Sequence, residues 1–141
     1  MCSSDLTTWT LAAEGAFGAP VAYPAHAEMA VRAALEMRRR LQAWNAARVR
    51  AGKTPLRHGI GIHTGLVLAG NIGSAERHAY ALVGDPVNLA SRIQGLNKEL
   101  GSDILVSGDT RRRLNGQFDL VPLPAVRVKG KSMEVEVYRL A

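Results

Sequence analysis

Asn88 and Arg92 are the two residues whose types and spacing best suit a chemical role. A neutral amide and a permanent planar cation four residues apart share one face of a helix, where they can bind a ribose or a phosphate group. The helix that must position them has clear start signals. A strand-like apolar run ends at Gly84, Asp85 can cap the helix, and Pro86 suits its first position. The pattern is also that of an ordinary capped surface helix, which spacing alone favours, so both interpretations stay open at this point.

Two further blocks accompany this helix. Residues 59–73 read Gly-Ile-Gly-Ile-His-Thr-Gly-Leu-Val-Leu-Ala-Gly-Asn-Ile-Gly, and residues 128–131 read Val-Lys-Gly-Lys. In this order and spacing, the three blocks resemble the catalytic domain of class III adenylate/guanylate cyclases over roughly residues 17–140. The resemblance implies an enzyme that converts ATP or GTP into a 3′,5′-cyclic nucleotide and pyrophosphate in intracellular signalling.

The resemblance assigns roles position by position. Asn88 matches the family's ribose-orienting asparagine, and Arg92 matches the arginine that stabilises charge at the α-phosphate. Lys129 matches the lysine that reaches the β- and γ-phosphates, and Lys131 is a nearby substitute, although solvated turn lysines remain an equal alternative. Ala81 stands at a base-selecting position, where a methyl group cannot hydrogen-bond to adenine or guanine. The choice between ATP and GTP therefore stays open.

The resemblance also implies a head-to-tail dimer and a divalent metal. Aspartates of one subunit would hold two Mg²⁺ or Mn²⁺ ions opposite the asparagine and arginine of the other subunit. Here Thr10-Leu11 occupies the place of one aspartate, and the family's first strand, which carries the other, is absent. We therefore expect no metal ligands in this chain and no activity from this fragment alone. For the full-length enzyme we expect a nucleoside triphosphate substrate and a homodimer, with any membrane or sensory domain on missing sequence.

The first residues do not fit this picture. Residues 1–6 show no structural pattern, and the run Cys-Ser-Ser-Asp-Leu is what a common sequencing adapter encodes when translated. We interpret residues 1–16 as a non-native N-terminus to be left out of fold reasoning. Residues 17–141 are then the C-terminal two-thirds of the cyclase catalytic domain.

Apolar spacing predicts the elements around the site. Helices are expected over residues 24–50 and 85–100, the second ending near Gly101. Strands are expected over 57–62, 66–72, 78–83 and 103–107, with a turn at Thr64-Gly65 and a brief helix capped by Asp109, and residues 118–126 pair with 133–140. These elements indicate an α+β domain. The resemblance implies a ferredoxin-like nucleotide cyclase sandwich, an antiparallel-rich sheet with helices on one face, here without its first strand and helix.

Composition limits the class of protein. The chain has 141 residues, 47% of them hydrophobic and 21% charged, as expected of one globular domain. It has no apolar run near the ~20 residues of a membrane helix and no signal peptide. The single cysteine, Cys2, excludes an internal disulfide and fits a reducing compartment. We expect a cytoplasmic location, or the cytoplasmic part of a membrane protein.

Net charge leaves room for other functions. The charge is +6, with arginine runs at 38–40 and 111–113, but no aromatic residues interleave with them. We interpret these arginine runs as solvated helix faces and expect no nucleic-acid partner. A basic nucleic-acid-binding module is thus the weakest alternative. The stronger one is a metal-less subunit that completes a cyclase site with a partner. We expect His63 to be structural, since it has no metal-spaced partner, and Asp85 to be a cap.

Overall fold

The computed structural model describes residues 2–9, 14–18, 22–74, 77–127 and 134–141. The helices are α1 (His26–Arg50), α2 (Asp85–Leu100) and α3 (Gly108–Arg111). The strands are β1 (Cys2–Trp9), β2 (Glu14–Phe17), β3 (Ile60–Ser74), β4 (Arg77–Val83), β5 (Ile104–Ser107), β6 (Leu120–Pro122), β7 (Val126–Arg127), β8 (Glu134–Val135) and β9 (Val137–Leu140). The two longer helices lie close to where periodicity predicts them, and the α+β composition is confirmed.

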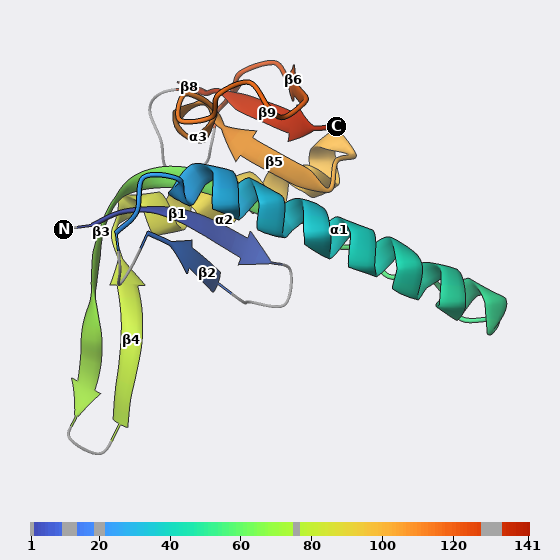
Figure 1. Ribbon diagram of the computed structural model, residues 1–141, viewed down its shortest axis with the longest axis horizontal. Coiled ribbons are helices and arrows are strands. Elements are labelled where there is room, and N and C mark those ends of the chain that lie inside the picture. The colour runs from blue at the N-terminus through green and yellow to red at the C-terminus, as the bar shows by residue number, and fades with distance from the viewer. Residues whose placement is uncertain (1, 10–13, 19–21, 75–76, 128–133) are drawn as a thin grey trace.

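One mixed sheet forms the body of the domain, in the order β2-β1-β3-β5-β9-β6 (Figure 1). β3 and β5 run parallel, with Ile60 opposite Ile104, and the other neighbours are antiparallel. The second half of β3, Leu68–Ser74, leaves this body and pairs with β4 in a hairpin that projects from the domain (Figure 1). The short strands β7 and β8 pair separately.

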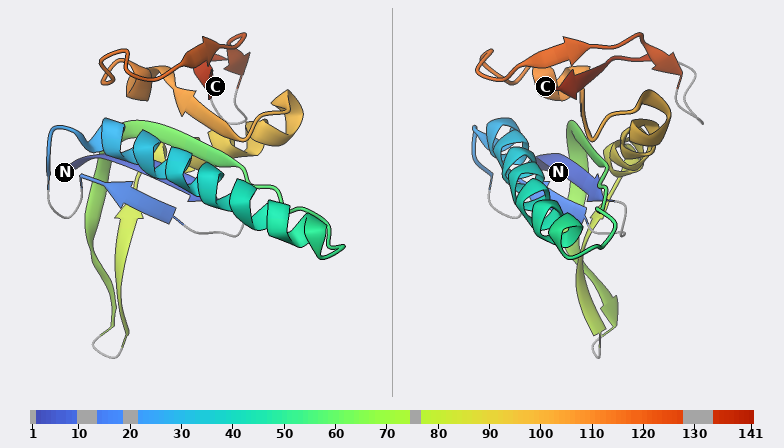
Figure 2. Two further views of the ribbon diagram at one scale, coloured as in Figure 1. Left: turned by 45° about the vertical axis from the view of Figure 1, so that its right-hand side comes forward. Right: turned by 90° about the vertical axis from the view of Figure 1, so that its right-hand side faces the viewer.

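α1 and α2 cover opposite faces of the sheet (Figure 2). Successive strand residues point to opposite faces, so Ile60 and Ile62 pack in one cluster while Leu105 packs in another. The α1 cluster contains Ala30, Val31, Ala34, Ile60, Ile62, Ile104, Val106 and Leu140. The α2 cluster contains Leu89, Ile93, Leu96, Leu105 and Val137. This arrangement differs from the expectation of helices on one face, because β3 and β5 are apolar or close-packed on both sides.

β3 is a single strand of 15 residues, where the sequence suggested two strands and a turn at Thr64-Gly65. Its first half pairs with β1 and β5, and its second half pairs with β4. Backbone pairing thus continues across Gly65 and Gly70, so the chain stays extended. The glycine at 65 serves a close contact with α2 instead of a turn.

The N-terminal residues take part in the sheet. β1 pairs with β3 in eight registered positions, from Cys2 opposite Val67 to Trp9 opposite Ile60, and β2 pairs with β1. This differs from the expectation that residues 1–6 contribute no structure. The physical reason is that β3 would otherwise present an unpaired row of backbone N–H and C=O groups to solvent. Any short extended segment can satisfy these groups, whatever the origin of its sequence.

Two helix caps differ from prediction by one or two positions. The N-cap of α2 is Gly84, with φ +148°, and Asp85 is the first helical residue. A carboxylate there still favours the positive end of the helix. For α3 the cap is Ser107, whose hydroxyl accepts from the backbone N–H of Thr110, and Asp109 lies inside the helix. At the other end of α2, Gly101 takes the left-handed conformation, with φ +63°, and ends the helix as predicted.

The C-terminal strands pair as expected. β6 pairs with β9, and Val126 of β7 lies opposite Val135 of β8. The segment between β7 and β8, residues 128–133, lies outside the described residues. Within the described part of the chain, no helix is both long and apolar enough to cross a membrane.

Candidate active site

The glycines on one side of β3 set the position of α2. A Cβ atom at Gly61 would lie 2.4 Å from the backbone nitrogen of Gln94 and 2.7 Å from the carbonyl oxygen of Ala90. At Gly65 it would lie 2.5 Å from Cγ of Pro86. Real Cβ atoms do not approach so closely, so only glycine permits this helix-to-strand distance. The glycine-rich block and the helix that follows it are therefore parts of one packing unit.

α2 has a buried side and a solvent side, and the two predicted residues lie on the latter. Leu89, Ile93 and Leu96 are buried against the sheet. Asn88 is exposed and Arg92 is half-buried, one helical turn apart. Within the described residues, neither side chain has a hydrogen bond or an ion pair. An amide and a guanidinium are thus held on a fixed helix with their donors available to a ligand.

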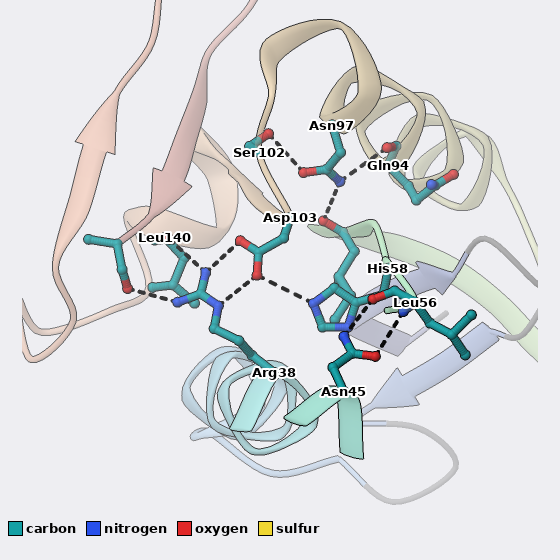
Figure 3. A network of polar contacts seen from close by, with 11 residues as sticks. Arg38, Asn45, Leu56, His58, Gln94, Asn97, Ser102, Asp103 and Leu140 are labelled. Carbon is teal, nitrogen blue, oxygen red and sulfur yellow. Dashed lines mark hydrogen bonds and ion pairs between the residues drawn. The ribbon is translucent and has the colours of Figure 1, made fainter. Parts of the chain in front are cut away.

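Asn97 fixes the opposite end of α2, and sequence reasoning missed this residue. Its amide donates to the backbone carbonyl of Ile60 at 2.9 Å, and its carbonyl accepts from the hydroxyl of Ser102 at 2.9 Å (Figure 3). Asn97 is buried although it is polar. The available signal was a polar residue four positions after Ile93, within the apolar register of the helix.

His63 lies in a buried polar cluster formed by the first half of β3, the end of β5 and α3. Its Nδ1 is 2.9 Å from Oγ of Ser107 and 3.9 Å from a carboxylate oxygen of Asp109, and 5% of its surface is exposed. Thr64 and Thr110 contact each other through their hydroxyls at 2.9 Å. The serine and the carboxylate approach the same ring nitrogen, which is not the geometry of a proton relay from serine through histidine to carboxylate. These contacts are those of a structural histidine.

The remaining predicted residues are placed only partly. Ala81 lies in β4, where its backbone pairs with Gly70. Lys129 and Lys131, and the Thr10-Leu11 pair at the missing aspartate position, lie outside the described residues. In the ranges that are described, no three His, Cys, Asp or Glu side chains gather as a metal site.

The basic runs are only partly solvated helix faces. Arg39 and Arg40 are exposed and pair with Glu36 on the same helix. Those ion pairs lower the pKa of the Glu36 carboxyl to about 2, mainly through hydrogen bonds from Arg39 and then Arg40. Arg38 instead turns inward, with 17% of its side chain exposed, and binds Asp103. One arginine of the run is therefore structural.

The mixed sheet covered by helices, and the α2 face with Asn88 and Arg92, define a nucleotide-cyclase type of α+β domain. The sequence pattern described as the adenylate and guanylate cyclase catalytic domain matches residues 12–141. The chain belongs to this family.

Curated relatives and solved structures agree with this assignment. The chain is 39% identical over 124 residues to adenylate cyclase 1 of Rhizobium meliloti, covering 88% of this chain and 19% of that protein. It is 38% identical over 120 residues to an adenylate cyclase of Anabaena cylindrica, covering 80% of this chain and 24% of that protein. The guanylyl cyclase Cya2 superimposes with a TM-score of 0.80 at 34% identity, over 91% of this chain and 64% of that chain. The ferredoxin-like cyclase fold is thereby confirmed.

The chain spans about a fifth to a quarter of the length of these two curated relatives. The relatives include proteins named for adenine and proteins named for guanine nucleotides. The substrate base and the activity of the whole protein are therefore matters for proposal.

Proposed function

We propose that this chain is the C-terminal part of a nucleotide cyclase domain that converts ATP or GTP into a 3′,5′-cyclic nucleotide and pyrophosphate. The observation that carries the proposal is the solvent face of α2. There Asn88 and Arg92 have no hydrogen bond or ion pair with any described residue, on a helix fixed by Gly61 and Gly65. Asn88 orients the ribose, and Arg92 neutralises charge that develops at the α-phosphate. Lys129 and Lys131 contribute at the β- and γ-phosphates, and Ala81 borders the base.

The role of Arg92 follows from its chemistry. In cyclisation the ribose 3′-oxygen attacks the α-phosphorus, the bond to pyrophosphate breaks, and negative charge shifts toward the leaving group. A guanidinium is always charged and can bind two phosphate oxygens at once. Because α2 is held at both ends, the backbone that carries Arg92 is fixed before the reaction, so only the side chain has to be ordered by the substrate.

The metal requirement of the family is not met by the residues of the α2 face. Its donors are an amide and a guanidinium, whereas Mg²⁺ and Mn²⁺ prefer carboxylate oxygens. We propose that the metal is held by aspartates that this chain does not carry, and we derive no step of the reaction from it.

A homodimer in the full-length protein is part of this proposal. The β3–β4 hairpin projects from the body (Figure 1), and Leu66 and Leu68 on β3 are each 59% exposed. Leu68 begins the hairpin and Leu66 lies just before it, and exposed leucines beside each other favour contact with a second copy. We further propose that the domain acts in the cytoplasm, where nucleoside triphosphates are available.

A second candidate function is that of a metal-less subunit which completes a site with a partner. A chain without the family's first strand would be expected to leave an edge of the sheet unpaired. In the structure β1 covers that edge of β3 along eight positions. Such a subunit would supply Asn88 and Arg92 to a partner that carries the metal aspartates.

Two assays separate these candidates. First, cyclic nucleotide production from ATP and from GTP with Mn²⁺ is measured for this chain and for the complete gene. We expect product only from the complete gene. Second, this chain is mixed with a cyclase subunit whose own asparagine and arginine are replaced by alanine. Restored activity in the mixture, lost again with Arg92→Ala in this chain, would favour the subunit role. If the product of the complete gene and the mixture both fail to make cyclic nucleotide, the cyclase proposal itself fails.

The origin of residues 1–16 is tested separately. We propose that they are non-native and that residues 17–141 are the C-terminal two-thirds of the domain. A long sequencing read through the 5′ end of the gene is expected to show an open frame that continues upstream of Phe17 without the Cys-Ser-Ser-Asp-Leu codons. Finding those codons within an uninterrupted gene would refute the proposal.

A further inference from the structure

A second candidate binding region lies at the far end of α2. A cavity of about 690 Å³ is bounded by the second half of α1, the segment that leads into β3, the last turns of α2 and the turn before β5. The last α2 residue that lines the cavity is Lys98. It follows Asn88 by ten positions, which places the two residues roughly 15 Å apart along the helix axis at 1.5 Å per residue. Neither Asn88 nor Arg92 lines the cavity, although its nearest α2 lining residue, Gln94, is only two positions after Arg92. The volume of the cavity is in the range of sites for small molecules.

The charges that line this cavity are strongly unbalanced. Four permanent cations, Arg38, Arg57, Lys98 and Arg139, border it together with one carboxylate, Asp103, giving +3 with histidine neutral. Arg38 binds that carboxylate at 2.7 and 2.8 Å, and His58 approaches it at 3.4 Å (Figure 3). The one negatively charged side chain of the lining is thus already neutralised by Arg38.

Three cations remain for a ligand. Arg57, Lys98 and Arg139 form no ion pair or side-chain hydrogen bond with the described residues. They come from three separate places: the segment before β3, the end of α2, and β9. The carboxyl end of α2 contributes about half a negative charge, which is less than the excess of the side chains. A ligand that carries two or more negative charges on one group matches this arrangement best.

We propose that this cavity binds the phosphate group of a small phosphorylated molecule. Arginine binds two phosphate oxygens at once, and lysine adds a compact charge, so each of these cations that line the cavity suits a dianionic phosphate. The three side chains are exposed, so they lose little hydration on binding and need no rearrangement of the core. The proposal stands independently of the proposed cyclase activity, because it uses none of the residues assigned to the reaction.

The test is calorimetric titration of this chain with inorganic phosphate and, separately, with glycerol 3-phosphate, in a metal-free buffer at low ionic strength. Saturable binding is expected, weakening several-fold when salt is raised enough to shorten the Debye length to a few ångströms. Equal affinity for the two probes would assign recognition to the phosphate group alone. Tighter binding of glycerol 3-phosphate would show that the cavity also contacts the organic part, and either result supports the proposal.

Substitutions locate the binding. The double variant Arg57→Gln/Lys98→Gln is expected to weaken phosphate binding at least ~10-fold, because two of the three available charges are lost. Arg113→Gln, which also removes one exposed cation but lies outside the cavity, is the matched control and should bind like the parent. Because these positions are exposed, circular dichroism should show that the variants fold. Absence of saturable binding up to about 10 mM phosphate, equivalent to less than ~3 kcal/mol, would overturn the proposal. So would binding that survives the double variant but is lost in Lys129→Ala.

Discussion

Arg38 and Asp103, 65 residues apart in the chain, form a two-point ion pair, with Nε 2.7 Å from Oδ2 and Nη2 2.8 Å from Oδ1 (Figure 3). The same guanidinium donates to the backbone carbonyls of Leu140 at 2.8 Å and Ala141 at 2.9 Å. One side chain of α1 thus joins the turn before β5 and the end of β9. Four hydrogen bonds from a largely buried cation make it a structural link between both halves of the sequence.

Replacing this arginine should destabilise the fold. We expect Arg38→Ala to lower the free energy of unfolding by about 1.5–3 kcal/mol, because charged hydrogen bonds are lost and a partly buried carboxylate loses its partner. Arg39→Ala is the control. Among the described residues Arg39 pairs with Glu36 on its own helix, and 69% of its side chain is exposed, so its loss should have little effect on the free energy of unfolding. Urea unfolding measures both, and equal costs would contradict the structural role of Arg38.

Stability should fall with acid through Asp103. Partial burial alone raises the pKa of this carboxyl, but hydrogen bonds from His58 and Arg38 and the nearby arginine charge outweigh it and hold the pKa well below its usual range. In the unfolded chain the carboxyl titrates near pH ~3.9. Since the folded pKa is the lower one, the stabilisation is complete above pH ~5 and is lost as pH falls through ~4 toward the folded value.

The variant Asp103→Asn isolates this effect. We expect it to be less stable than the parent at pH 6, with the difference shrinking by pH 3, where the parent has lost part of its advantage. The measurement is the difference in unfolding free energy between the two proteins at both pH values. A difference that stays constant with pH would show that the carboxylate charge does not stabilise the fold.

Two glycine substitutions should have opposite signs. Gly61→Ala places a Cβ atom against backbone atoms of α2 and should cost about 1–3 kcal/mol or more, as overpacking does. Gly95→Ala places it in open space on an exposed turn of α2 and should stabilise by about 0.5–1 kcal/mol through helix propensity. Thermal unfolding compares the two. Similar changes in stability at both positions would mean that the glycines of β3 do not set the distance between α2 and β3.

Catalysis in the full-length enzyme should depend on Arg92. Arg92→Ala is expected to lower turnover by at least ~100-fold, typical of losing a donor that acts in the transition state, with little change in melting temperature. Ser91→Ala, a neighbouring exposed position on the same helix, is the control and should keep parental activity. Turnover that is unchanged in Arg92→Ala would remove the role assigned to this residue.

The short helix α3 should depend on Ser107 more than on Asp109. Ser107→Ala removes a helix cap and the hydroxyl that contacts His63, at an expected cost of about 1–2 kcal/mol. Asp109→Ala removes an exposed carboxylate that pairs with Arg112 one turn away and should cost less than ~0.5 kcal/mol. Chemical denaturation of both variants decides which residue caps the helix. The reverse order of costs would restore Asp109 as the cap.

The elements with strong periodicity could be predicted from the amino-acid sequence, and so could the placement of Asn88 and Arg92 on one face of α2. The apolar spacing of α1 and the Gly-Asp-Pro start and Gly101 end of α2 are local signals, and local sterics decide them. Asn88 and Arg92 lie on the same face of α2 because residues four positions apart do so in any α-helix. The family was visible in the same motifs, because glycines and a polar pair at fixed spacing leave a sequence pattern.

Features that depend on long-range contacts could not be predicted from local sequence signals. A glycine at position 65 predicts a turn locally, yet β3 stays extended because β1, β4 and β5 pair with it on both edges. The face on which each helix packs follows from which side of β3 is glycine and which is isoleucine, and this becomes clear only when both helices are in place. Arg38 looked like one of three solvated arginines. Its burial depends on Asp103, whose position 65 residues away is fixed by the fold and by no local signal.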